Sequence, residues 1–293
     1  MKNVLVTGGE GQLATCIKDI SSVNEKYHFI YVDVDELDIT KKNEVEDFFS
    51  KFKITHCINC AAYTAVDKAE SDKISAHQIN VVGAKNLAEA CKKNKAILIH
   101  ISTDFVFDGK QTNLYSEEDK ACPLGVYGET KLKGEKEIGI TLKEHFIIRT
   151  SWLYSEHNHN FLKTMIKLGK ERDEISVVID QIGTPTYAGD LAKVIIDLIT
   201  LESDSYGKYH YSNEGVASWY DFAKAIFEEC KIDIRLFSIK SEAYPTPAER
   251  PKFSVMDKSK IKKDFALIIP YWRDSMKICL RRLDVSYKKT ITN

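Results

Sequence analysis

The chain has 293 residues and a formal net charge of −1, with 43% hydrophobic and 29% charged residues. These values are typical of a globular protein with one large α/β domain or two smaller ones, and the near-neutral charge argues against nucleic acid or an anionic membrane as a partner. No stretch of the sequence resembles a signal peptide or an apolar membrane span, so we expect a cytoplasmic protein.

The first predicted element is a short apolar strand over residues 4–7, which leads into a glycine-rich turn and a helix-like stretch over residues 15–20. Glycines let the backbone approach a pyrophosphate, and the free N–H groups at the start of a helix bind its charge. The spacing Gly8-x-x-Gly11-x-x-Ala14 therefore predicts a dinucleotide site. We expect the cofactor to contact Gly8, Gly11, Gln12 and Leu13.

The second predicted strand, residues 29–32, ends at Asp33. A carboxylate at this point accepts hydrogen bonds from the adenosine ribose and repels a 2′-phosphate, which favours NADH slightly over NADPH. Asp38 is a second candidate for the same contact. Lys41 and Lys42 lie near enough in sequence to leave the use of NADPH open.

Two further predicted strands bring polar and small residues to one edge of a sheet. Residues 55–59 lead into a segment that we expect at the cofactor, Ala61, Ala62 and Tyr63. Small residues there leave room for a flat ligand at the edge where open α/β sheets bind. Residues 96–101 lead into Ser102, Thr103 and Asp104. The Thr103 hydroxyl either binds a substrate oxygen or caps the end of the strand.

Tyr127 and Lys131 are four residues apart at the predicted start of a helix, so their side chains share one face. A free tyrosine has a pKa of about 10, and a nearby ammonium group stabilises the phenolate. The pair predicts an acid/base group, although the same spacing also occurs on exposed helix surfaces.

Strands and helices alternate about five times through residue 149, which predicts a doubly wound parallel sheet of the Rossmann type, followed by a smaller C-terminal substrate-binding domain. We assign residues 1–150 to dinucleotide binding, with a return to the sheet at about 185–212. Residues 151–184 and 213–283 mainly form the substrate-binding part. Residues 284–293 form a polar, frayed tail.

The cysteines and histidines predict no metal site. Seven cysteines, an odd number, indicate reduced thiols. Cys57 and Cys60 form a C-x-x-C pair in a predicted strand, where they would point to opposite faces. His157 and His159 lie in a polar stretch typical of a loop.

Together, these motifs resemble those of the extended short-chain dehydrogenases/reductases and, more narrowly, of the dTDP-4-dehydrorhamnose reductase family. The similarity runs from Val4 to about Leu283. Its more specific segments are 65–70 (AVDKAE), 102–107 (STDFVF), 149–152 (RTSW), 180–186 (DQIGTPT) and 244–251 (YPTPAERP). The resemblance implies reduction of the C4 ketone of dTDP-4-dehydro-L-rhamnose by NADH or NADPH, giving dTDP-L-rhamnose for cell-surface polysaccharide.

The resemblance also implies roles for individual residues. Tyr127 would donate the proton, Lys131 would lower the pKa of Tyr127 and bind the nicotinamide ribose, and Thr103 would stabilise the oxyanion. Substrate contacts are implied for Thr64, Val66, Thr103, Asp104, Trp152 and Arg250, with Arg250 paired to the diphosphate.

The sequence departs from this family at one known feature. Some members bind magnesium at a dimer interface through two glutamates, and Cys16 and Gly189 stand at those positions here. We therefore predict no magnesium site of that kind, and a monomer or a weak homodimer.

Two alternatives remain open. One is another sugar-nucleotide reductase, dehydratase or epimerase of the same superfamily. Dehydratases of this superfamily carry a Ser-Thr-Asp-Glu motif, and this chain has Phe105 in place of the glutamate. Without that carboxylate there is no acid to eliminate water, so a reductase is preferred. The other is a non-catalytic protein like the regulatory subunit of methionine adenosyltransferase, which the intact Thr103, Tyr127 and Lys131 argue against.

Overall fold

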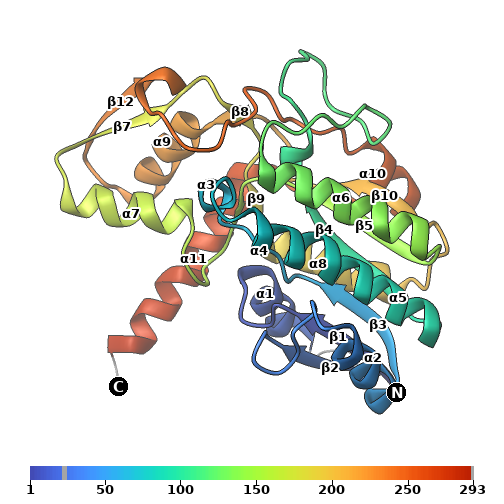
Figure 1. Ribbon diagram of the computed structural model, residues 1–293. Helices are drawn as coiled ribbons and strands as arrows, with labels where there is room; N and C mark the ends of the chain where they lie inside the picture. The colour runs from blue at the N-terminus through green and yellow to red at the C-terminus, as the bar shows by residue number, and fades with distance from the viewer. Residues whose placement is uncertain (22–24, 292–293) are drawn as a thin grey trace.

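A six-stranded parallel sheet forms the centre of the protein, as the computed structural model shows for residues 1–21 and 25–291, with side chains described through Leu283 (Figure 1). The strand order is β10-β5-β4-β3-β1-β2, and neighbouring strands pair in parallel. This arrangement confirms the predicted doubly wound fold. The strands are β1 (Lys2–Thr7), β2 (Tyr27–Val32), β3 (Ile54–Asn59), β4 (Ile97–Thr103), β5 (His145–Thr150) and β10 (Gly207–His210).

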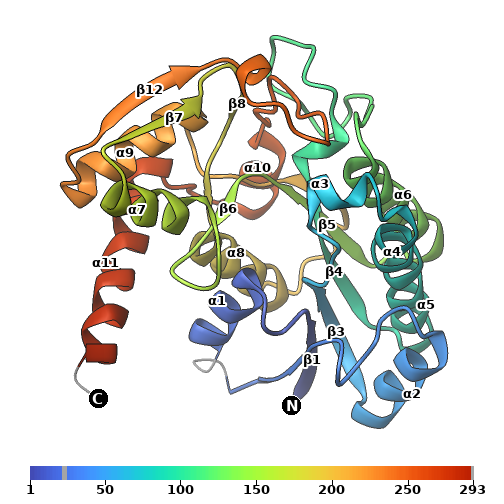
Figure 2. The same ribbon diagram turned by 60° about the vertical axis from the view of Figure 1, so that its left-hand side comes forward.

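Helices cover both faces of this sheet (Figure 2). One face packs against α1 (Gln12–Ser21) and α8 (Ala188–Thr200). The opposite face packs against α2 (Lys42–Phe52), α5 (Ala84–Asn94) and α6 (Val126–Thr141).

Strand β1 shows why the sequence folds into two layers. Val4, Leu5 and Val6 are fully buried, and their side chains alternate between the faces, so Val4 and Val6 pack on the α1 side and Leu5 on the α2 side. Cys57 and Cys60 likewise pack into opposite layers, as predicted. None of the seven cysteines, all of which lie in the described part of the chain, forms a disulfide.

After β5 the chain builds a smaller unit with a core of its own. This unit contains three two-stranded sheets, β6–β9, β7–β12 and β8–β11, with α7, α9 and α11 packed around them. Its elements are β6 (Leu153–Tyr154), α7 (Phe161–Glu171), β7 (Glu174–Val178), β8 (Ile182–Gly183), β9 (Thr186–Tyr187), β11 (Ala217–Ser218), α9 (Trp219–Cys230), β12 (Arg235–Ile239) and α11 (Trp272–Ile291). Between β9 and β11 the chain returns to the large sheet through α8 and β10.

The remaining helices are short. They are α3 (Val66–Ala69), α4 (Lys73–His77), the π-helix η1 (Gln78–Gly83), the 3₁₀ helices η2 (Asp104–Val106) and η3 (Ser241–Ala243), and α10 (Ser259–Phe265). The backbone of residues 284–291 continues α11, where a frayed tail was expected, and residues 292–293 lie outside the described residues. Within residues 1–21 and 25–291, each helix is too short or too polar to cross a bilayer.

Candidate active site

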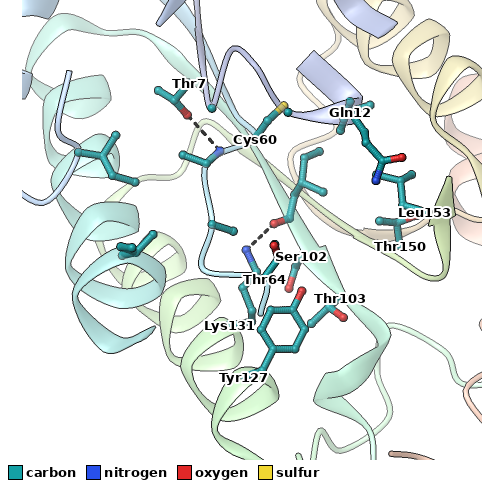
Figure 3. Close-up of a pocket in the computed structure, with 18 of the residues that line it drawn as sticks. Thr7, Gln12, Cys60, Thr64, Ser102, Thr103, Tyr127, Lys131, Thr150 and Leu153 are labelled. Atoms are coloured by element: carbon teal, nitrogen blue, oxygen red, sulfur yellow. Dashed lines mark hydrogen bonds between the residues drawn. The ribbon is translucent and has the colours of Figure 1, made fainter. Parts of the chain in front are cut away.

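A cavity of about 770 Å³ opens at the carboxyl ends of the parallel strands, where open α/β sheets bind their ligands (Figure 3). Fifteen of the residues singled out from the sequence line it. They are Gly8, Gly11, Gln12, Leu13, Asp33, Asp38, Ala61, Ala62, Thr64, Val66, Thr103, Asp104, Tyr127, Lys131 and Trp152. In Figure 3, Tyr127 and Thr103 lie beside each other, and Thr7, Cys60 and Gln12 lie farther along the same cavity.

The glycine turn is built for close approach of a ligand to the backbone. Gly8 has φ +63°, and a Cβ at this position would lie 2.8 Å from the backbone nitrogen of Ala61, so the turn requires glycine. The Asp33 carboxylate anchors the turn by accepting a hydrogen bond from the backbone N–H of Glu10 at 3.1 Å. Helix α1 then begins at Gln12, with its N-terminus at the cavity. This is the geometry of an anion site.

Gln12 is held in a fixed orientation by a segment that the sequence did not connect with it. Its Oε1 accepts hydrogen bonds from Ser155 Oγ at 3.1 Å and from Asn160 Nδ2 at 2.9 Å. Both partners come from the loop between β6 and α7. The two bonds use the carbonyl end of the Gln12 amide, so its NH₂ end is the one available to a ligand in the cavity.

Tyr127 lies in the first turn of α6, which begins after Gly125. Its ring meets the edge of Phe105, with centroids 5.5 Å apart. The next residue, Gly128, allows α6 to approach η2, because a Cβ there would collide with the carbonyl oxygen of Phe105. The close approach places the tyrosine next to Thr103.

The pKa values of the pair differ from the expectation. Burial raises the pKa of Tyr127 to about 12, with the Asp104 charge adding to the rise and a hydrogen bond with Thr103 opposing it. Burial lowers the pKa of Lys131 to about 8. The Lys131 ammonium donates to the carbonyl oxygen of Ile101 at 2.6 Å. The protein alone therefore keeps Tyr127 protonated, whereas we expected Lys131 to lower its pKa.

Thr103 has the capping role, which was one of the two interpretations that the sequence left open. Its Oγ1 accepts a hydrogen bond from the backbone N–H of Phe105 at 3.1 Å and thereby caps η2, yet it also lines the cavity. Burial raises the pKa of the adjacent Asp104 to about 6. Asp104 Oδ2 and the hydroxyl of Thr150 are buried without a hydrogen-bond partner among the described residues, and both residues line the cavity. Such groups are suited to bind a polar ligand.

Trp152 forms one wall of the cavity in an unusual backbone conformation, with φ +47°. Its indole stacks on that of Trp219, with centroids 3.6 Å apart and planes 6° from parallel. A Cβ at Gly183 would lie 2.7 Å from the Trp152 ring, so this glycine makes room for the indole. The sequence singled out Trp152 but not its partner.

Two residues singled out from the sequence do not line the cavity. The Tyr63 hydroxyl donates to Asp72 Oδ2 at 3.2 Å. The Arg250 guanidinium is engaged by Asp67, with Nη2 2.8 Å from Oδ2 and Nη1 3.1 Å from Oδ1. In this structure Arg250 thus has a carboxylate partner in place of the diphosphate that we expected.

Asp19, Glu156 and His157 place three potential metal-ligand atoms within 4.8 Å of one another, although the sequence suggested no metal site there. His157 Nε2 lies 2.7 Å from Asp19 Oδ2, and the Glu156 carboxylate accepts from the hydroxyl of Tyr187 and from Arg282. These contacts give each member of the cluster a protein partner.

Gly189, which stands where some relatives have a glutamate, packs closely against Tyr187. A Cβ at Gly189 would lie 2.5 Å from the Tyr187 ring, so a larger side chain there would displace that ring.

Comparison with known proteins gives consistent matches over nearly the whole chain. A family model described as the RmlD substrate binding domain matches residues 1–285. A curated protein named dTDP-4-dehydrorhamnose reductase, from Aggregatibacter actinomycetemcomitans, is 41% identical over 287 residues, covering 94% of this chain and 98% of that protein.

Solved structures agree with this match. A dTDP-4-dehydrorhamnose reductase from Clostridium acetobutylicum has a TM-score of 0.93 at 41% identity, covering 96% of this chain and 99% of that chain. The dTDP-4-dehydrorhamnose reductase of Bacillus anthracis, solved in complex with NADP, has a TM-score of 0.93 at 39% identity, covering 96% of this chain and all of that chain.

Proposed function

Since this chain belongs to the family of the RmlD substrate binding domain, we propose that it is a dTDP-4-dehydrorhamnose reductase. The proposed reaction reduces the C4 ketone of dTDP-4-dehydro-L-rhamnose with NADH or NADPH and yields dTDP-L-rhamnose for cell-surface polysaccharide. The observation that carries the proposal is the single cavity in which the glycine turn, Thr103, Tyr127 and Lys131 meet.

The residues at the glycine turn fit a dinucleotide. Gly8 keeps the backbone free of a Cβ, the α1 N-terminus offers unpaired N–H groups, and the amide NH₂ of Gln12 is directed by its partners on the other side. Gly11 and Leu13 also line the cavity at the glycine turn, and the small side chains of Ala61 and Ala62 leave space for a flat ring of the dinucleotide. When bound, the reduced nicotinamide supplies the hydride.

Tyr127 would serve as the proton donor to the substrate oxygen at C4. Its raised pKa keeps the phenolic proton in place at neutral pH, which suits a group that donates it only when an alkoxide forms. The charged Lys131 in the same cavity would stabilise the phenolate that is left, and the Thr103 hydroxyl would stabilise the oxyanion. Lys131 would also bind the nicotinamide ribose.

The sugar nucleotide would lie on the side of Trp152, where Thr64, Val66 and Asp104 also line the cavity. The flat indole would pack against the sugar or the base. Arg250 would reach the diphosphate only if it exchanged its Asp67 partner for the phosphate oxygens. That exchange is chemically reasonable, because a guanidinium fork fits both carboxylate and phosphate.

The coenzyme preference follows from Asp33. Its carboxylate lies in the cavity beside the glycine turn, where it would accept hydrogen bonds from ribose hydroxyls and repel a 2′-phosphate. Asp38 also lines this part. We propose use of both coenzymes with some preference for NADH; the relative from Bacillus anthracis was solved with NADP.

We also propose a division of labour along the chain. Residues 1–150 and about 185–212 would hold the dinucleotide, and residues 151–184 and 213–283 mainly the sugar nucleotide. The membership of β10 and α8 in the large α/β unit supports this division. The seven cysteines form no disulfide, which supports a cytoplasmic location. We also propose a monomer or a weak homodimer.

The decisive experiment follows the oxidation of NADH and of NADPH in parallel when dTDP-4-dehydro-L-rhamnose is generated in situ by an upstream dehydratase and epimerase. We expect oxidation that depends on this protein, with dTDP-L-rhamnose as the product. Binding of both coenzymes without oxidation would contradict the proposal and favour another sugar nucleotide. Stoichiometric association with a methionine adenosyltransferase, without turnover, would instead favour a regulatory protein.

A further inference from the structure

A chain of buried polar side chains runs from Lys131 away from Tyr127. Lys131 Nζ lies 3.3 Å from His100 Nε2, and His100 Nδ1 lies 2.9 Å from Asn59 Nδ2. Asn59 Oδ1 lies 2.7 Å from Thr7 Oγ1 and accepts its hydrogen bond. All four residues are at most 2% exposed. Buried polar groups of this kind need complementary donors and acceptors.

The imidazole of His100 can carry its proton on either of its two nitrogens. Burial, with the Lys131 charge adding to it, lowers the pKa of His100 well below its usual range, so the ring is neutral, with one N–H and one lone pair. If Nε2 carried the proton, it would face the Lys131 ammonium as one donor against another. If Nδ1 carries the proton, Nε2 is an acceptor for the ammonium.

The Lys131 ammonium decides between the two tautomers, because the Asn59 amide can match either one. As placed, the amide nitrogen faces Nδ1 of His100. A half-turn of this amide exchanges oxygen and nitrogen without moving the other atoms, and places the oxygen opposite Nδ1 of His100. The NH₂ group then donates to Thr7 Oγ1, and the hydroxyl hydrogen of Thr7 is free to point into the cavity that this residue lines. In this arrangement the contacts of His100 with Lys131 and Asn59 are both matched.

We propose that His100 is a positioning residue that holds the Lys131 ammonium by accepting its hydrogen bond at Nε2, with the Asn59 amide oxygen accepting from Nδ1–H of His100. The catalytic consequence rests on the proposed reductase function. A neutral imidazole stabilises the ammonium without neutralising it. The charge of Lys131 thus remains available to the phenolate of Tyr127.

The charged groups around Lys131 support this assignment. Glu135, one turn farther along α6, favours the charged lysine. Its carboxylate is engaged by Arg149 from β5, with Nη2 2.6 Å from Oε2 and Nε 2.8 Å from Oε1. Cys60, beyond the end of β3, is a partly buried thiol whose pKa is raised by loss of solvation, and so it carries no charge at neutral pH. His145 on β5 also contributes to the lowered pKa of His100.

The first test measures the tautomer of His100 and the pKa of Lys131 by NMR, in the complete protein with labelled histidine and lysine. The ¹⁵N shifts should show His100 protonated at Nδ1 and unprotonated at Nε2. A neutral His100 protonated at Nε2 would overturn the proposal. These readouts do not depend on turnover, so they separate a failure of this proposal from a failure of the proposed reductase function.

The second test compares substitutions of His100. His100→Phe removes the acceptor at similar size, and we expect the pKa of Lys131 to fall by about one unit, with the alkaline limb of kcat/KM shifted to lower pH by the same amount. His100→Gln keeps an acceptor oxygen and should restore most of this shift. His56→Phe is the matched control, because His56 is also a buried histidine but lies on the neighbouring strand β3. It should leave the pKa of Lys131 unchanged.

The outcomes are distinct even where a substitution costs stability. If His100→Phe fails to fold, the His100→Gln variant and the tautomer measurement in the unmodified protein still decide. An unchanged pKa of Lys131 in folded His100→Phe would overturn the proposal. So would equal shifts in His100→Phe and His56→Phe, because the effect would then come from general loss of packing.

Discussion

Trp152 stacks on Trp219 almost face to face, although Trp152 lies in the connection between β5 and β6 and Trp219 begins α9. Trp152 has the positive φ that bulky residues rarely adopt, which costs on the order of 1–3 kcal/mol. The second indole, itself hydrogen-bonded through Nε1 to Gln181 Oε1 at 3.2 Å, holds the first against the cavity. Trp219 therefore shapes a wall that it does not itself line.

Substituting Trp219→Leu should weaken binding of the sugar nucleotide. An aromatic pair contributes about 0.5–1.5 kcal/mol beyond burial, so we expect KM for the sugar nucleotide to rise about 3- to 10-fold, with little change in the Kd of NADH. Trp219→Phe keeps an aromatic ring, so its KM for the sugar nucleotide should lie between those of the unmodified enzyme and Trp219→Leu. Steady-state kinetics and coenzyme titration measure both quantities, and an equal loss in NADH binding would argue against the assignment.

Substituting Tyr127→Phe tests the proton donor. The variant should fold and bind NADH, because it loses only a hydroxyl, yet its kcat should fall about 100- to 10,000-fold. Thermal unfolding and coenzyme titration provide the controls on fold and binding. Turnover close to that of the unmodified enzyme would remove Tyr127 from this role.

Substituting Lys131→Met should stabilise the protein while it abolishes most activity. Burial lowers the pKa of Lys131 from 10.5 to about 8, so the unfolded chain binds a proton that the folded protein lacks between these pH values. The stability of the unmodified enzyme should therefore rise with pH across this window. Burying the lysine charge lowers the free energy of unfolding of the unmodified enzyme by at most about 3 kcal/mol at pH 7. Lys131→Met removes this cost but also loses the hydrogen bond to Ile101, so its net gain in stability is smaller.

Urea unfolding at neutral and at strongly alkaline pH measures this effect. The advantage of Lys131→Met should be clear at neutral pH, should shrink as the pH rises from about 8 to 10.5, and should stay constant above that. An advantage that does not change with pH would mean that packing, not charge, separates the two proteins.

Two glutamates on α6 offer a matched comparison of buried and exposed ion pairs. Glu135 and Arg149 are almost fully buried, and Glu135→Gln would leave the guanidinium without its charge partner, at a cost of about 3–5 kcal/mol. Glu129 pairs with Lys133 at the surface, so Glu129→Gln should cost less than about 1 kcal/mol. Denaturant unfolding of both variants checks the contrast; similar losses would contradict it.

Substituting Asp33→Ser should move the coenzyme preference toward NADPH. The change removes the charge that repels a 2′-phosphate and weakens the contact with the ribose, so the ratio of the Kd values should shift by about tenfold or more. Asp35→Ser, an equal change of charge at a nearby exposed position, is the control. The assignment fails if both variants shift the ratio equally.

The sequence predicted the large sheet and most of the cavity because the relevant signals are local. The glycine turn, the acidic end of β2 and the Tyr127–Lys131 spacing each lie within one element or at its end. The parallel sheet then brings these ends to one edge. The fold class could therefore be derived before the structure was known.

Other features depend on contacts between distant residues, which no local pattern encodes. The bond of Asp67 with Arg250 joins residues 183 positions apart, and the contacts of Gln12 with Ser155 and Asn160 are similarly remote. The pKa of Tyr127 was also mispredicted, because the helical spacing places Lys131 on the same face but does not reveal that its ammonium turns to Ile101.

Strand β10 covers the outer edge of β5, yet Gly207 leaves the ribosome long after Thr150. During synthesis the first five strands can already pair while that edge remains open, and an open parallel edge is a surface on which other chains can add. A chain that is truncated between β9 and β10 would keep this edge permanently exposed. Such fragments should aggregate, and rescue should require residues 207–210 to be present.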